Sequence, residues 1–132
     1  MLVIMDIKFS LFNLAWMGFL GGIISGAILG LLFHNEDFMG GYNSFSRRLT
    51  RLGHISFFGI GIVNLLIALS QDKLDITINS FLYINIAMMI TAITMPLLCF
   101  LSAWKKPFRH LFFIPVLGFG FSVFMILKSL DF

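Results

Sequence analysis

Four apolar runs dominate the sequence, and each is close to the ~20 residues that a helix needs to cross the hydrocarbon core of a bilayer. They cover residues 11–33, 52–69, 80–104 and 108–127. Backbone N–H and C=O groups find no water in lipid, so segments this apolar are expected to be helical. None of them shows the alternation with period two that is typical of membrane β-barrel strands. The sequence therefore predicts an all-α integral membrane protein.

The composition supports this class. Of the 132 residues, 59% are hydrophobic and only 11% are charged, against roughly 25% charged residues in soluble domains. The net charge of +3 does not indicate nucleic-acid binding, because basic loops of membrane proteins set orientation or contact anionic lipid. We expect the partners to be the lipid bilayer and other membrane protein subunits, and no nucleic acid.

The connections between the apolar runs are short, and the longest is His34–Arg51. Short connections favour neighbouring helices that run antiparallel. We therefore expect residues 1–132 to form a single membrane domain, with four transmembrane helices in an up-down antiparallel bundle.

Basic residues are unevenly distributed between the two sides of this bundle. The first and third connections carry Arg47, Arg48, Arg51, Lys105, Lys106 and Arg109, whereas the opposite side carries Lys8, Lys73 and Lys128. The positive-inside rule then places both termini outside the cytoplasm, and we expect a bacterial inner (plasma) membrane. The arginines at 47, 48 and 51 are expected to contact anionic lipid or an acidic partner surface.

The first apolar run contains a stripe of glycines at four-residue spacing, in the segment GFLGGIISGAILGLLFH. The stripe consists of Gly18, Gly22, Gly26 and Gly30, and His34 follows in the same register. Small residues at this spacing let two helix backbones approach closely in lipid. The stripe predicts a tight helix–helix seam, either with the second helix of this chain or with another protein chain.

The three histidines all fall at the proposed cytoplasmic ends of the helices. Histidines on facing helices can bind a b-type haem, and neutral imidazole is a common metal ligand. His54 and His110 are the best candidate pair for a cofactor. Histidine is also common at membrane interfaces, and no HxxxH or ExxH spacing supports a metal site. We expect no bound cofactor, with haem b as the alternative.

Three asparagines, Asn13, Asn64 and Asn85, fall in the outer halves of the first three helices. They are expected either to form interhelical hydrogen bonds that fix the register of the helices or to line a polar pocket for a small substrate. No Asp or Glu lies inside an apolar run, which argues against a proton-coupled pump.

The sequence shows no nucleophile–base pair, phosphate-binding loop or paired carboxylates. Our leading hypothesis is therefore a small non-catalytic membrane subunit that assembles or stabilises a larger complex, with a bioenergetic complex as a natural host. The alternatives are a b-type haem or metal-binding protein that uses His54 and His110, and a small oligomeric channel or transporter lined by the asparagines.

Overall fold

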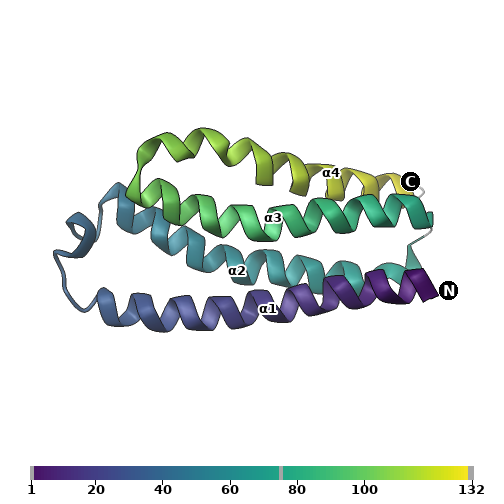
Figure 1. Cartoon of the computed structure of the whole chain (residues 1–132), viewed down its shortest axis with the longest axis horizontal. Helices are drawn as coiled ribbons and strands as arrows, with labels where there is room; N and C mark the ends of the chain where they lie inside the picture. Colours follow the sequence, from purple (N-terminus) through teal and green to yellow (C-terminus); the bar gives the residue numbers. More distant parts are fainter. Residues whose placement is uncertain (1, 75, 131–132) are drawn as a thin grey trace.

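The computed structural model describes residues 2–74 and 76–130, with residues 2–9 described by their backbone alone. This part of the chain consists of helices joined by turns (Figure 1). The elements in chain order are α1 (Leu2–Leu32), η1 (Phe38–Gly40), α2 (Phe45–Ser70), η2 (Gln71–Lys73), α3 (Ile78–Trp104), η3 (Lys106–Phe112) and α4 (Phe113–Ser129).

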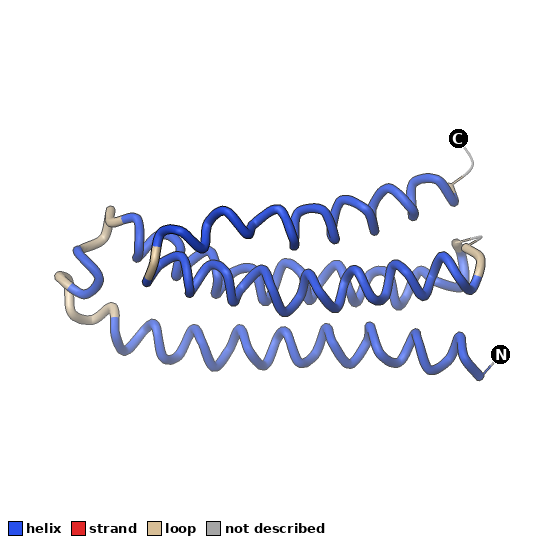
Figure 2. The backbone as a smooth tube through the Cα atoms, turned by 45° about the horizontal axis from the view of Figure 1, so that its top comes forward, coloured by secondary structure: helices blue, strands red, loops and turns tan. Residues whose placement is uncertain are grey.

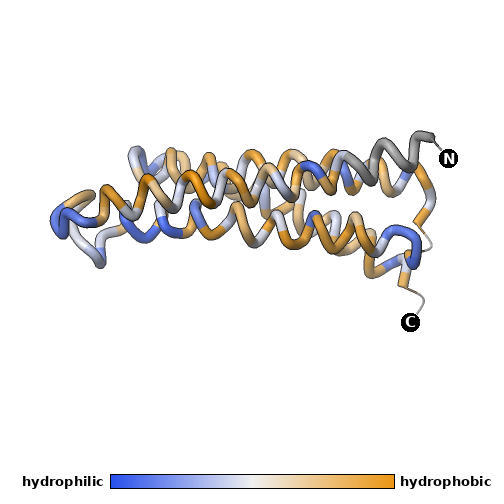
Figure 3. Tube along the Cα trace, turned by 90° about the horizontal axis from the view of Figure 1, so that it is seen from below, coloured by the Kyte–Doolittle hydropathy of each residue, from blue (hydrophilic) through white to orange (hydrophobic). Residues whose placement is uncertain are grey.

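Four segments are long and apolar enough to cross a membrane, as the sequence predicted. They are Ser10–Leu32, Phe45–Lys73, Ile78–Trp104 and Lys106–Ser129. Hydrophobic residues follow most of the length of the helices, and hydrophilic residues concentrate at the turns (Figure 3). The second helix begins at Phe45 rather than at residue 52, so the end of the predicted first connection is helical.

Two capping side chains explain where the second and third helices begin. The N-cap Ser44 accepts a hydrogen bond on its Oγ from the backbone N–H of Arg47 at 3.1 Å. Thr77 caps α3 in the same way, through the backbone N–H of Ser80 at 3.4 Å. Each bond satisfies one of the N–H groups that the first turn of a helix leaves unpaired.

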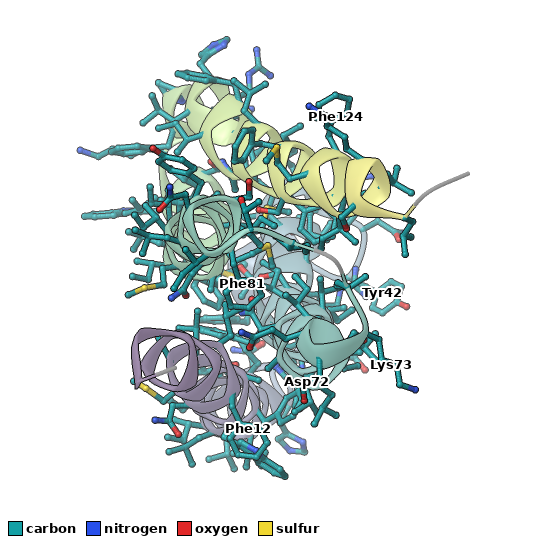
Figure 4. The ribbon with its side chains drawn as sticks, turned by 90° about the vertical axis from the view of Figure 1, so that its right-hand side faces the viewer. Phe12, Tyr42, Asp72, Lys73, Phe81 and Phe124 are labelled. Atoms are coloured by element: carbon teal, nitrogen blue, oxygen red, sulfur yellow. The ribbon has the colours of Figure 1, made fainter. Side chains whose placement is uncertain are left out.

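The four long helices are unequally packed. α1 lies against α2 and, less extensively, against α3, whereas α4 packs mainly against α3. α1 and α4 lie at opposite sides with α2 and α3 between them, both in a side view (Figure 2) and in a view along the helices (Figure 4). Only 11% of the most apolar window is buried in the first and fourth spans, against 39% in the second and third. The bundle is therefore open, with two inner and two outer helices.

The main hydrophobic core lies among α1, α2 and α3, toward the end of the bundle where the chain termini lie (Figure 1). It contains Leu11, Ile60, Ile67, Ala68, Phe81, Ile84 and Met88. The fourth helix joins this unit through Gly118, where an added Cβ would lie 2.6 Å from Oγ1 of Thr91 and 3.1 Å from the Ala87 carbonyl oxygen. The Thr91 hydroxyl is also 3.4 Å from the carbonyl oxygen of Pro115. Glycine thus lets α4 approach the α3 backbone.

At the other end of the bundle, Arg47 connects α2 to the end of α1. Its side chain is 6% exposed. Its guanidinium donates to the carbonyl oxygens of Phe33 at 2.9 Å and Glu36 at 2.8 Å, and it lies 4.3 Å from the centroid of the Phe33 ring. Both residues follow Leu32, the last residue of α1, so their carbonyl oxygens have no partner within the helix and accept from the guanidinium instead.

We expect Arg47→Gln to destabilise the protein by about 2 kcal/mol, because two charge-assisted hydrogen bonds and a cation–π contact are lost. Arg48→Gln is the matched control, since Arg48 is exposed. Thermal unfolding in detergent measures both variants. Equal melting temperatures for the two variants would show that Arg47 does not anchor α1.

Candidate functional site

The glycine stripe of α1 lies against α2. A Cβ added at Gly18 would lie 3.1 Å from the backbone oxygen of Phe57. At Gly22 it would lie 2.5 Å from Cε2 of Phe58, and at Gly26 it would lie 2.6 Å from Cε1 of His54. Gly30, by contrast, has no such neighbour within 4 Å. Three of the four glycines therefore face the second helix of the same chain.

The second helix contributes its own glycine to this contact. A Cβ added at Gly61 would lie 2.8 Å from Cε1 of Phe19 and 3.2 Å from the backbone oxygen of Ala15. Small residues from both helices thus meet, and each glycine accommodates a ring or a carbonyl of the opposite helix. We call this contact, formed by Ala15, Gly18, Gly22 and Gly26 with His54, Phe57, Phe58 and Gly61, the α1–α2 seam.

His54 lies inside the α1–α2 seam and is hydrogen-bonded there. Its Nδ1 is 3.1 Å from Oγ of Ser25, and the Ser25 hydroxyl donates to the carbonyl oxygen of Gly22 at 3.1 Å. Which of the two groups donates in the bond between Ser25 and His54 depends on the tautomer of the imidazole. The sequence pattern identified His54 as a candidate cofactor ligand, but it did not identify Ser25 as its partner.

His110 lies elsewhere. It is exposed on η3, which packs against α3 and α4. No ring contact between His54 and His110 is found among the described residues, and His34 is also exposed. The same residues contain no group of three or more His, Cys, Asp or Glu side chains that could hold a metal ion. The structure thus gives the two candidate haem ligands different surroundings, one in a helix seam and one at the surface.

The three asparagines also have different surroundings. Asn64 is completely buried and Asn85 is 6% exposed, whereas Asn13 is half-buried. Oδ1 and Nδ2 of Asn64 and Oδ1 of Asn85 are buried without a hydrogen-bond partner among the described residues. An unpaired buried polar group costs about 1–3 kcal/mol. The asparagines therefore place a polar spot within the apolar part of the bundle, with no hydrogen bond between them.

The three arginines of the first connection have separate roles. Arg47 caps α1, as described above. Arg51 donates to the carbonyl oxygen of Tyr42 at 3.0 Å, and its guanidinium lies 4.4 Å from the centroid of the Tyr42 ring. The side chain of Arg48 is exposed and makes no hydrogen bond or ion pair with the described residues. Of the three guanidinium groups, that of Arg48 is the one that the described residues leave without a bond.

A row of aromatic rings crosses the α1–α2 seam. Neighbouring ring centroids are 6.2 Å apart for Phe12–Trp16, 5.5 Å for Trp16–Phe19, 6.3 Å for Phe19–Phe58 and 5.5 Å for Phe58–His54. Trp16, the second ring of the row, is 55% exposed, and Phe12 lies on the side of α1 that is away from α4 (Figure 4). We call these five residues the aromatic row. The contacts between neighbouring rings give one outer face of the protein a defined shape.

Comparison with known proteins adds no identification. No protein-family model matches the chain, and neither a curated protein nor a solved structure gives a match. The interpretation of the site therefore rests on its own residues and geometry.

We expect Gly22→Leu and Gly26→Leu to lower accumulation of the protein, because a bulky side chain would push α1 away from α2. Overpacking of this kind costs about 1–3 kcal/mol. Gly30→Leu is the matched control on the same stripe, since Gly30 has no neighbour across the seam. Accumulation in membranes and thermal unfolding in detergent compare the three variants. Unchanged accumulation of Gly22→Leu and Gly26→Leu would contradict this account of the seam.

Proposed function

We propose that the protein is a small non-catalytic membrane subunit that assembles with a larger membrane complex and stabilises it. The observation that carries the proposal is the aromatic row, in which Trp16, the second ring, is exposed. Tryptophan and other aromatic side chains are enriched where protein interfaces gain most of their binding energy. Apolar surface gains little by exchanging lipid for protein, so association in a membrane depends on close packing of fixed shapes.

The use of the polar side chains supports this proposal. Arg47 and Arg51 are bound to carbonyl groups of the chain itself. The Nδ1 atom of His54 is bound to Ser25, and the Thr91 hydroxyl is 3.4 Å from the carbonyl oxygen of Pro115 on α4. These groups hold helix ends and helix contacts together. This pattern favours a structural role over a reactive one.

In the membrane, we propose that the four helices cross in up-down order with both termini outside the cytoplasm. The support is the cluster of basic residues where α1 joins α2 and where α3 joins η3. Positive charge is retained on the cytoplasmic side during insertion.

Cysteine labelling tests this orientation. Cysteines replace the exposed residues Asn43, in the first connection, and Asn79, at the start of α3, in a Cys99→Ala background. In intact cells, a membrane-impermeant maleimide is expected to label position 79 and to label position 43 only after permeabilisation. The reverse labelling pattern would invert the orientation.

Site-specific photo-crosslinking tests the proposed partner face. A photoreactive amino acid at Trp16 is expected to give a discrete crosslink to a larger membrane polypeptide that co-purifies at fixed stoichiometry. The matched control is Phe124, which is 63% exposed on the opposite outer helix. Equal crosslinking from both positions, or crosslinks to lipid alone, would contradict the subunit proposal.

An absorption spectrum of the purified protein tests the haem alternative. A Soret band that disappears in His54→Ala would favour that alternative over the subunit proposal.

A further inference from the structure

An apolar groove lies on the side of the bundle away from the aromatic row. Its walls are the 52–63 segment of α2 and the 115–120 segment of α4, and Thr91 and Met95 of α3 also line it. The groove has a volume of about 580 Å³. It exists because α4 packs mainly against α3, which leaves the facing sides of α2 and α4 uncovered.

The groove extends over only part of the bundle's length. From Leu52 to Val63 the helix rises about 17 Å. This is close to half of the ~30 Å hydrocarbon core, which is the thickness of one leaflet. A transmembrane helix of a partner would continue through both leaflets, whereas the acyl chain of a phospholipid ends at the middle of the bilayer. The length of the groove therefore favours a lipid chain.

Two glycines keep the groove open. Gly59 on α2 and Gly120 on α4 both line it, and neither would bring an added Cβ within 4 Å of another group. These two glycines do not serve contacts within the chain, unlike those of the α1–α2 seam. A larger residue at either position would occupy the space of the groove itself.

Cations lie at the end of the groove that is closest to the connections η1 and η3. Arg48 precedes the groove residue Leu52 by four positions, so the two share one face of α2. Arg109 lies on η3, which leads directly into α4, and Pro115 of α4 lines the groove. The side chains of both arginines are exposed and make no hydrogen bond or ion pair with the described residues.

A further contact places the two basic segments side by side. Nζ of Lys106, at the start of η3, lies 5.9 Å from the centroid of the ring of Phe45, the first residue of α2. No acidic side chain lines the groove. Glu36 and Asp37 instead line a separate pocket beside Phe33, at the end of α1. The mouth of the groove is thus positively charged.

We propose that this groove binds an anionic phospholipid from the leaflet on the side of η1 and η3. One acyl chain lies between α2 and α4, and the phosphate group contacts Arg48 and Arg109. Charge complementarity identifies the headgroup as anionic, and the length of the groove identifies the occupant as a lipid of one leaflet. This site is independent of the partner proposed for the aromatic row, since His54 and Phe58 lie on the opposite face of α2 from Leu52 and Gly59.

The test compares lipids that share the same acyl chains. The full chain is purified in a non-ionic detergent, and binding of phosphatidylglycerol and of phosphatidylcholine is measured by native mass spectrometry. We expect preferential binding of phosphatidylglycerol. Arg48→Gln and Arg109→Gln are each expected to weaken it roughly fivefold. The control variants Lys73→Gln and Lys128→Gln, exposed at the opposite end of the bundle, should bind as the unaltered chain does. Equal binding of the two lipids, or no effect of the arginine variants, would overturn the proposal.

A second pair of variants tests the acyl chain separately from the headgroup. Gly59→Leu fills the groove and is expected to abolish binding of phosphatidylglycerol, whereas Gly30→Leu, also in open space, leaves it unchanged. Thermal unfolding without added lipid verifies that both variants are folded. Unchanged lipid binding in Gly59→Leu would overturn the proposal. So would a dimer of the unaltered chain that Gly59→Leu dissociates, because the groove would then hold a second copy.

Discussion

The close approach of α1 to α2 is the contact on which the rest of this structure depends. Lipid chains are as apolar as leucine side chains, so the hydrophobic effect does not draw two helices together within a bilayer. Dispersion attraction between closely packed atoms is left to hold the helices together, and it weakens quickly when a gap opens between them. Gly18 and Gly61 remove the side chains that would hold the two helices apart. The rings of Phe58 and His54 then lie over Gly22 and Gly26, which orders the aromatic row.

Polar side chains reinforce this arrangement at the ends of the contact and within it. Arg47 binds the carbonyl oxygens of Phe33 and Glu36, which follow the last residue of α1. Ser25 and His54 satisfy each other in the seam. Asn64 and Asn85 differ from these residues, because their buried oxygens have no partner among the described residues. These buried oxygens therefore contribute no hydrogen bond to the stability of the bundle.

The two faces of α2 have different consequences. One face carries His54 and Phe58 into the seam with α1. The other carries Leu52 and Gly59 into the groove beside α4. Because α4 is held at Thr91 and Gly118 of the α3–α4 contact, it does not close over α2. We therefore propose a protein partner for the aromatic row beside the first face and a phospholipid for the groove on the second face, each on the basis of its own residues.

The sequence by itself determined the helices. Runs such as 80–104 have to be helical in lipid, because each unpaired backbone group would be costly there, and Ser44 and Thr77 mark helix starts by a local hydrogen bond. The spacing of Gly18, Gly22 and Gly26 likewise predicted a seam, since residues four apart share a helix face.

Only the tertiary structure decided which surfaces meet. The rotation of each helix about its axis places Gly26 against His54, leaves Gly30 open and separates Asn64 from any hydrogen-bond partner. The same rotation buries the side chain of Arg47 and leaves the side chain of Arg48 exposed. Sequence patterns indicate this rotation poorly in a membrane protein, because apolar residues suit both lipid and protein surroundings, and close packing between particular side chains makes the choice.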